Sequence, residues 1–159
     1  MGRNGRDSHP QRNSRDVGLV YFFGTFEHSI DERGRLAIPA RYRRAFVDGG
    51  VLRDGPEGCI ELYTDAAFTD EIQRRLGTET GNRRLSGRRT RRKFMHNAFT
   101  VELDRQGRVL IPQQLRDQDD AESRMVIVGC GDYLELWSPE EWSAEIERVR
   151  DEGNDDEDT

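Results

Sequence analysis

Residues 31–43 of the chain read DERGRLAIPARYR, and residues 104–116 read DRQGRVLIPQQLR. The two strings lie 73 positions apart and agree at six places, which is too much agreement for chance. The matched pairs are Asp31 and Asp104, Gly34 and Gly107, Arg35 and Arg108, Ile38 and Ile111, Pro39 and Pro112, and Arg43 and Arg116. The chain therefore contains an internal repeat, and whatever one copy of the string forms should occur twice.

The repeat continues beyond these two strings. The segment CIELYTDAAF at 59–68 resembles YLELWSPEEW at 133–142, now at an offset of 74 residues. Both segments run into apolar residues at helical spacing, so a helix is predicted in each copy. These helices should begin at Thr64-Asp65 and at Ser138-Pro139.

The length of the chain limits how the copies can fold. Its 159 residues suffice for one domain, or for two halves of roughly 70 residues, each near the size at which one core becomes marginal. The two halves are therefore expected to need each other. The predicted segments are a disordered N-terminal extension at 1–18, a first domain at 19–77, a basic helical linker at 78–97, a second domain at 98–150 and an acidic disordered tail at 151–159.

Each copy predicts a tight turn between two short strands. Apolar and polar residues alternate along 26–30 and again along 35–38, as in strands with one apolar face. In the three-residue loop between them, Gly34 tolerates the left-handed backbone that closes such a turn. Asp31 precedes the loop, where its carboxylate can accept backbone N–H groups. The corresponding residues of the second copy are Asp104 and Gly107.

The same geometry places an arginine beside each turn. Asp31 and Arg35 should form the first facing pair of the two strands, and Asp104 and Arg108 should repeat it. A single pair of this kind would be read as a surface ion pair worth about 0–1 kcal/mol. Its repetition, with a basic residue in each loop, counts against that interpretation. The basic loop residues are Arg33 and Arg105.

A short helix should follow each strand pair. Pro39 and Pro112 cannot continue a central strand but suit the first turn of a helix, so ARYRRAF at 40–46 and QQLRDQ at 113–118 are predicted helices. Arg43 and Arg116 lie on these helices. We interpret them as structural residues that brace the hairpin from its helix.

Charge is distributed unevenly along the chain. The net charge is −6, but residues 151–159 contain six acidic and no basic residues, so the other 150 residues sum to zero. Residues 83–93 contain seven basic and no acidic residues, and a local basic face matters more for nucleic-acid binding than the global sum. This run can contact DNA phosphates or pair with acidic residues of a neighbouring subunit, with Leu85, Met95 and Phe99 on its buried side. The candidate phosphate contacts are Arg88, Arg89, Arg91 and Arg92.

Nothing in the sequence points to an enzyme. Cys59 and Cys130 lie in apolar runs without metal-ligand spacing and are interpreted as buried thiols. The sequence predicts no catalytic residue, no metal site and no cofactor. No run approaches the roughly 18 apolar residues of a membrane span, and the first 16 residues lack the apolar centre of a signal peptide. We therefore expect a cytoplasmic protein with no membrane partner.

The paired strings resemble a known family. With two copies of D-x-x-G-R-[LV]-x-I-P-x-x-x-R, preceded by FFGTFEHSID at 22–31, the sequence is similar to the MraZ family of bacterial transcriptional regulators across residues 21–150. That family belongs to the wider AbrB-like, swapped-hairpin class of DNA-binding folds. Gly81 and Gly87 depart from a strongly helical linker, since each costs about 1 kcal/mol relative to alanine.

The resemblance implies an α+β fold of two tandem AbrB-like swapped-hairpin β-barrel halves that pack as a pseudo-dimer with short helices. It also implies a ring of subunits, association with the nucleoid, and repression at short DNA repeats upstream of the division and cell-wall gene cluster. The family's DNA-binding signature falls on Asp31, Arg35, Asp104 and Arg108, with each aspartate orienting its arginine. Arg33 and Arg105 in the loops would be secondary contacts.

Two other classes of function stay open. AbrB-like domains also serve as antitoxins that bind a protein partner, although here the second half repeats the first. The ring could instead be a scaffold in which the hairpin arginines pair between subunits. A scaffold should assemble without preferring promoter DNA, and it should fall apart when those arginines are removed.

Overall fold

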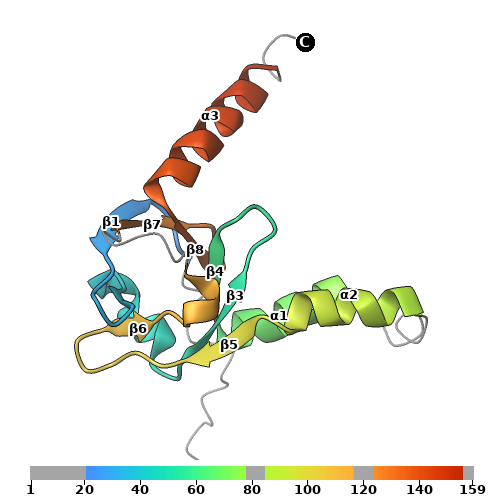
Figure 1. The fold of residues 1–159 in the computed structure, drawn as a ribbon, viewed down its shortest axis with the longest axis horizontal. Coiled ribbons are helices and arrows are strands. Elements are labelled where there is room, and N and C mark those ends of the chain that lie inside the picture. Colours follow the sequence, from blue (N-terminus) through green and yellow to red (C-terminus); the bar gives the residue numbers. More distant parts are fainter. Residues whose placement is uncertain (1–20, 78–84, 117–123, 156–159) are drawn as a thin grey trace, which may run out of the picture.

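The computed structural model describes residues 21–77, 85–116 and 124–155 of the chain (Figure 1). The strands are β1 (Thr25–Ser29), β2 (Arg35–Ala37), β3 (Gly50–Asp54), β4 (Ile60–Thr64), β5 (Ala98–Val101), β6 (Arg108–Leu110), β7 (Arg124–Gly129) and β8 (Tyr133–Trp137). The α-helices are α1 (Asp65–Leu76), α2 (Leu85–Met95) and α3 (Pro139–Asp155), and the 3₁₀ helices are η1 (Ala40–Phe46) and η2 (Gln113–Leu115). The fold is therefore α+β, with antiparallel strands throughout the described sheets.

The strands pair about a pseudo-twofold axis. One sheet has the order β1-β7-β8-β4-β3-β5, which reads the same from both ends when the two repeats are exchanged, and β2 pairs with β6 in a separate ribbon. At the centre of the sheet Glu61 faces Glu135, and at the centre of the ribbon Leu36 faces Val109. Each of these pairs joins equivalent residues of the two copies, so the axis passes between them.

The two repeats are intertwined rather than placed side by side. β1 of the first copy pairs with β7 of the second, and β5 of the second copy pairs with β3 of the first. Buried residues from both copies, including Leu36, Leu52, Val109 and Ile127, form one core cluster. The segments 19–77 and 98–150, expected as two domains, therefore share one sheet and one core. The described strands do not close into a barrel.

The predicted local hairpins are wrong beyond their first rung. Strands β1 and β2 flank the first turn, and the Asp31 N–H donates a 2.9 Å hydrogen bond to the Arg35 carbonyl, but in the described residues the ladder between them extends only to an isolated bridge between Ile30 and Leu36. Each strand then pairs with the other copy, because that arrangement buries the apolar face of the ribbon completely. The helices predicted after Pro39 and Pro112 are 3₁₀ helices, and the second spans only Gln113–Leu115.

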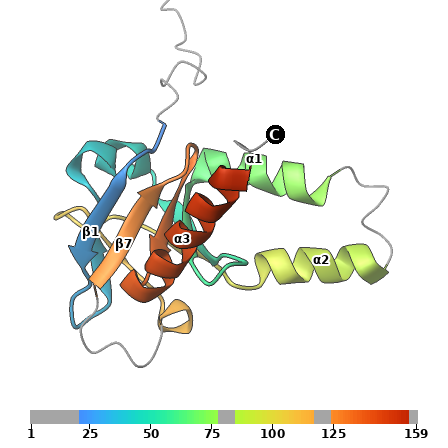
Figure 2. The ribbon, with the colours of Figure 1, turned by 90° about the horizontal axis from the view of Figure 1, so that it is seen from above.

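The helices cover the sheet unequally. Helix α1 begins where the Thr64 hydroxyl accepts a 3.1 Å hydrogen bond from the Ala67 N–H, and Phe68 and Leu76 bury its inner face. Helix α2 runs alongside α1, and the two project together from the sheet (Figure 2). The ring of Phe94 on α2 stacks 5.9 Å from that of Phe68. None of the described helices has the length and apolar character needed to span a bilayer.

Helix α3 corrects the predicted C-terminal boundary. It starts at Pro139 and continues to Asp155, five residues into the segment 151–159 that was expected to lack structure. Its contact with the sheet is confined to the first turns, where Trp142 packs 5.8 Å from Trp137, and the rest projects away from the molecule (Figure 1). The predicted N-terminal extension at 1–18 and part of the linker, 78–84, lie outside the described residues.

A buried ion pair breaks the symmetry between the copies. Arg53 and Glu61 pair in the interior, each almost completely buried, and the Arg53 guanidinium lies 4.2 Å from the centre of the Phe94 ring. Burial raises the pKa of the Glu61 carboxyl, against the attraction of Arg53. The position equivalent to Arg53 in the second copy is Val128, which faces Glu135 as Arg53 faces Glu61. This polar anchor for α2 therefore exists in the first copy alone.

The ribbon provides a test of how the halves are joined. Leu36 is fully buried, whereas Leu110, on the other face of the same ribbon, is 54% exposed. We expect Leu36→Ala to lower the free energy of unfolding by about 2–5 kcal/mol, because it leaves a cavity at the axis. Leu110→Ala should change it by about 0.5 kcal/mol or less. Urea unfolding followed by tryptophan fluorescence measures both, and equal effects would show that the ribbon is not part of the core.

Candidate nucleic-acid interface

The β2–β6 ribbon has one buried face and one outward face. Leu36 and Val109, with no exposed surface, point into the core. Side chains alternate along a strand, so Arg35 and Arg108 share the opposite face with the residues across from them. Those residues are Leu110, opposite Arg35, and Ala37, opposite Arg108. An exposed two-stranded ribbon thus carries two of the predicted site arginines on a single face.

A tight turn precedes each of these strands. Gly34 and Gly107 have φ angles of +81° and +75°, in the region that favours glycine. In the first turn, Asp31 Oδ1 accepts hydrogen bonds of 2.9 Å from the Arg33 N–H and 2.8 Å from the Arg35 N–H. Asp104 binds the second turn in the same way, through the N–H groups of Gln106 and Arg108. Each aspartate therefore holds its turn and aligns the backbone of the following arginine.

These hydrogen bonds also set the ionisation of the two aspartates. The backbone N–H of Arg35 lowers the pKa of Asp31, with smaller contributions from Arg33 and the charge of Arg108. The backbone N–H of Arg108 likewise lowers the pKa of Asp104. Backbone donors stabilise the charged form of a carboxyl, so both groups are ionised at neutral pH.

The two ribbon arginines are not equivalent. Arg108 Nε lies 3.0 Å from Asp104 Oδ2, and its Nη1 lies 3.3 Å from Asp31 Oδ2, so its guanidinium bridges the turns of both copies. Arg35 has no carboxylate partner among the described residues. The pairing predicted between the side chains of Asp31 and Arg35 is therefore not seen, and the Arg35 guanidinium keeps its donors available. Arg33 and Arg105 are exposed in their loops.

Arg43 and Arg116 cross between the copies. The Arg43 side chain lies against Gly107 of the second turn, and the Arg116 guanidinium lies against Gly34 of the first. The backbone follows the same exchange, since the Ile38 N–H donates to the Gly107 carbonyl at 3.0 Å. Each arginine therefore packs on the turn of the opposite copy, and the Arg43 Nε also donates a 3.0 Å hydrogen bond to the Ile38 carbonyl of its own copy. Sequence spacing carries no signal for this exchange.

The basic helix lies away from the ribbon. Arg88, Arg89, Arg91 and Arg92 are exposed on α2. Among the described side chains of this helix Phe94 is buried and the predicted Met95 is exposed, while the side chain of Leu85 lies outside the description. In Figure 1, α2 extends to the opposite side of the molecule from the turn that precedes β6. The structure therefore does not bring the predicted phosphate contacts together with the ribbon arginines.

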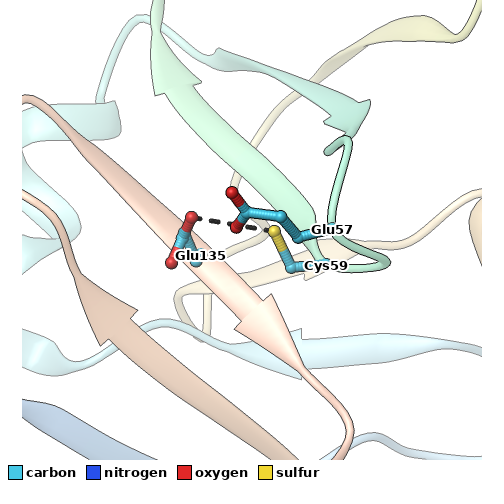
Figure 3. Close-up of side chains that lie close together, drawn as sticks. All are labelled: Glu57, Cys59 and Glu135. Carbon is cyan, nitrogen blue, oxygen red and sulfur yellow. Dashed lines mark hydrogen bonds between the residues drawn. The ribbon is translucent and has the colours of Figure 1, made fainter. Parts of the chain in front are cut away.

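A third group of side chains gathers near the centre of the sheet. The atoms that could bind a metal lie within 4.8 Å of one another in Glu57, Cys59 and Glu135 (Figure 3). Burial raises the pKa of the Cys59 thiol, which donates a 3.7 Å hydrogen bond to Glu135. A metal ligand would have to be the thiolate, so this environment favours a hydrogen-bonded thiol over a metal ligand.

The fold and the ribbon define a class of protein: two intertwined copies of a strand, turn, strand and helix unit that present arginines on an exposed β-ribbon. The family model described as "MraZ protein, putative antitoxin-like" matches residues 21–89 and 94–159. The chain belongs to the MraZ family, and the resemblance found in its repeated strings is confirmed.

Curated relatives agree with this assignment. A protein named Transcriptional regulator MraZ from Thermomicrobium roseum is 41% identical over 132 residues, which cover 83% of this chain and 92% of the relative. Proteins of the same name from Lactiplantibacillus plantarum and Mycoplasmoides gallisepticum are 40% and 36% identical, over 76% and 73% of this chain and 84% and 80% of the relatives.

The lowered pKa values predict how the turns respond to acid. Because the folded pKa of each aspartate lies below the unfolded value of about 3.9, their stabilisation is present above that pH and is lost as the pH falls through the folded pKa. Asp31→Asn with Asp104→Asn keeps acceptor oxygens but removes the titration, so stability should depend less on pH between about 4 and 2. Urea unfolding across this range measures the change, with Asp48→Asn as an exposed control. An unchanged pH profile would contradict the assignment.

The contact between Arg116 and Gly34 predicts a coupled substitution. A Cβ at Gly34 would lie 2.6 Å from Arg116 Nη1, whereas one at Gly131, with a similar φ of +86°, meets nothing within 4 Å. Both alanine variants should lose about 1–2 kcal/mol from the left-handed backbone, and Gly34→Ala should lose more. The excess should vanish in an Arg116→Ala background, as a double-mutant cycle measures. Equal losses at Gly34 and Gly131 would show that Arg116 does not pack on the turn.

Proposed function

We propose that the protein is a sequence-specific DNA-binding transcriptional regulator whose β2–β6 ribbon reads DNA. The observation that carries this proposal is the outward face of the ribbon, where Arg35 and Arg108 stand over a fully buried Leu36–Val109 pair. The fold is proposed to be the AbrB-like swapped-hairpin type. The exchange of β1 and β5 between the copies supports this assignment.

The chemistry of the ribbon suits the major groove. That groove admits a two-stranded β-ribbon, and an arginine can bind guanine O6 and N7 in bidentate fashion, for about 1–3 kcal/mol of discrimination per contact. Arg35, without a carboxylate partner among the described residues, has its guanidinium free for such a contact. Arg108 would exchange one of its aspartate partners for DNA. Arg33 and Arg105, exposed in the turns, add phosphate contacts that position the ribbon without reading sequence.

The turn residues give this interface its rigidity. Asp31 and Asp104 hold the backbone ahead of each arginine, and Arg43 and Arg116 pack on the turns from the opposite copies. A preorganised ribbon loses little conformational entropy on binding. The regulator is therefore proposed to dock as a rigid body rather than to fold on DNA.

Assembly and target follow from the family. The relatives are named as transcriptional regulators, and the family resemblance supports a ring that represses transcription from short repeats ahead of the division and cell-wall genes. Several ribbons on one ring would engage several repeats together, which raises avidity without a new kind of contact. The proposed location is the cytoplasm, in association with the nucleoid. The proposal assigns no catalysis and no cofactor.

One observation favours a scaffold as the second candidate. Arg108 already bridges Asp31 and Asp104 within the chain, as a purely structural arginine would. In that case the ribbon arginines would hold the protein together and leave no preference for promoter DNA. The two candidates differ in what removing the arginines does to assembly.

Arg35→Ala with Arg108→Ala tests the proposal. Wild-type protein should prefer the DNA upstream of its own gene over scrambled DNA, and the variant should lose this preference while keeping its assembly. The expected loss is about 1–3 kcal/mol per arginine, or roughly five- to 150-fold each. Fluorescence anisotropy across a salt series measures the affinity, and light scattering measures the mass.

Arg44→Ala with Arg124→Ala is the matched control, since it removes two exposed arginines outside the ribbon. The control should keep the preference for promoter DNA. If the ribbon variant falls apart, the arginines are structural and the scaffold is supported. If wild type and variant bind both DNAs alike, sequence is not read by the ribbon.

A further inference from the structure

Two helices of the chain carry opposite and unbalanced charge. Helix α2 contains five basic side chains and no acidic one over Leu85–Met95. The described side chains of α3 include six acidic and two basic residues. The acidic residues are Glu140, Glu141, Glu145, Glu147, Asp151 and Glu152. Each helix therefore presents a strong field of a single sign to its surroundings.

Helix α2 has no acidic residue to balance its charge, and in the described residues α3 balances its own only through the Arg148–Glu145 ion pair. Residues four apart share a helix face, and like charges at that spacing destabilise a helix. Helix α2 contains two such pairs, Arg88 with Arg92 and Arg89 with Lys93. Helix α3 has Glu147 with Asp151 at the same spacing, and neither of these carboxylates has an ion-pair partner in the described part of the chain. Asp151 also lies toward the C-terminal end, where the helix dipole disfavours an anion.

The two helices cannot relieve each other inside one chain. They leave the sheet in different directions, α2 beside α1 and α3 from the end of β8 (Figure 1). The described residues form no ion pair between them, and the basic side chains of α2 are exposed. Met95 on α2 is 39% exposed and Val149 on α3 is 52% exposed, so each charged helix also presents an uncovered apolar side chain.

We propose that α2 of one subunit docks against α3 of a second, identical subunit, with Arg88 and Arg92 facing Glu147 and Asp151. Both pairs are four residues apart, a rise of about 6 Å along a helix, so two helices lying side by side bring both charges of one pair opposite both charges of the other. DNA is the less favoured partner for α2, because α2 projects away from the ribbon and every subunit carries the acidic helix α3 that complements its charge.

This contact joins different surfaces of two identical subunits. An interface of that kind is heterologous, and repeating it produces a closed ring or an open filament. The inference therefore deepens the ring assembly proposed above by naming its contact surfaces, and it does not rest on DNA binding. Exposed charges are screened by salt, so the assembly should dissociate as ionic strength rises.

Charge reversal of the full-length protein tests the inference without DNA. One variant carries Arg88→Glu and Arg92→Glu, and the other carries Glu147→Lys and Asp151→Lys. By sedimentation velocity each variant alone should fall from the wild-type mass to that of a single chain. Mixed in equal amounts they should reassemble, because the reversed α2 of the first then faces the reversed α3 of the second. Arg44→Glu with Arg124→Glu reverses two exposed charges elsewhere and should keep the wild-type mass.

Three outcomes would overturn the inference. Wild type could sediment as a single chain, a reversed variant could keep the wild-type mass, or the mixture could fail to reassemble although circular dichroism shows both variants folded. A reversed α2 variant that keeps its mass but binds scrambled DNA at least tenfold more weakly would assign α2 to phosphate contact instead. Because the mass is measured without DNA, a negative result in this experiment does not test DNA reading by Arg35 and Arg108, which is tested separately by the anisotropy measurement.

Discussion

The structure depends on the pairing of each repeat with the other about the pseudo-twofold axis. Leu36 meets its own equivalent, Val109, and both are removed from water. Neither half could bury its apolar ribbon face alone, and about 70 residues supply too little core for independent stability. The exchange of β1 and β5 accompanies this arrangement, and Arg43 and Arg116 each contact the turn of the opposite copy.

Duplication left the two copies alike at the turns and different elsewhere. Both turns have the same aspartate geometry, yet Arg108 bridges two carboxylates while Arg35 has none among the described residues. The Arg53–Glu61 pair that contacts α2 has no equivalent in the second copy, where Val128 faces Glu135. A buried ion pair is weak support for stability but becomes costly when one partner is lost. The Arg53 guanidinium lies against the Phe94 ring of α2, so the pair helps to fix the position of that helix.

These differences separate two surfaces with different chemistry. The ribbon presents a few held arginines on a rigid support, which suits recognition of base edges. Helix α2 presents dense positive charge and α3 dense negative charge, which suits contact between subunits. The net charge of −6 hides both surfaces, since the acidic end of the chain cancels charge that is located elsewhere. Local charge therefore says more about partners than the sum does.

The turns, the family and the repeat could be predicted from the amino-acid sequence. A turn is set within about five residues by an aspartate that accepts backbone N–H groups and a glycine with positive φ, and both were readable at Asp31 and Gly34. The helices after Thr64 and Ser138 were also predictable from local sequence, because apolar residues recur there at helical spacing. The tertiary structure alone decided which strands pair, that Arg116 packs on Gly34 and that Arg35 stays unpaired by the described carboxylates. Those outcomes depend on which apolar faces are buried together, and residues 73 positions apart carry no local signal for that choice.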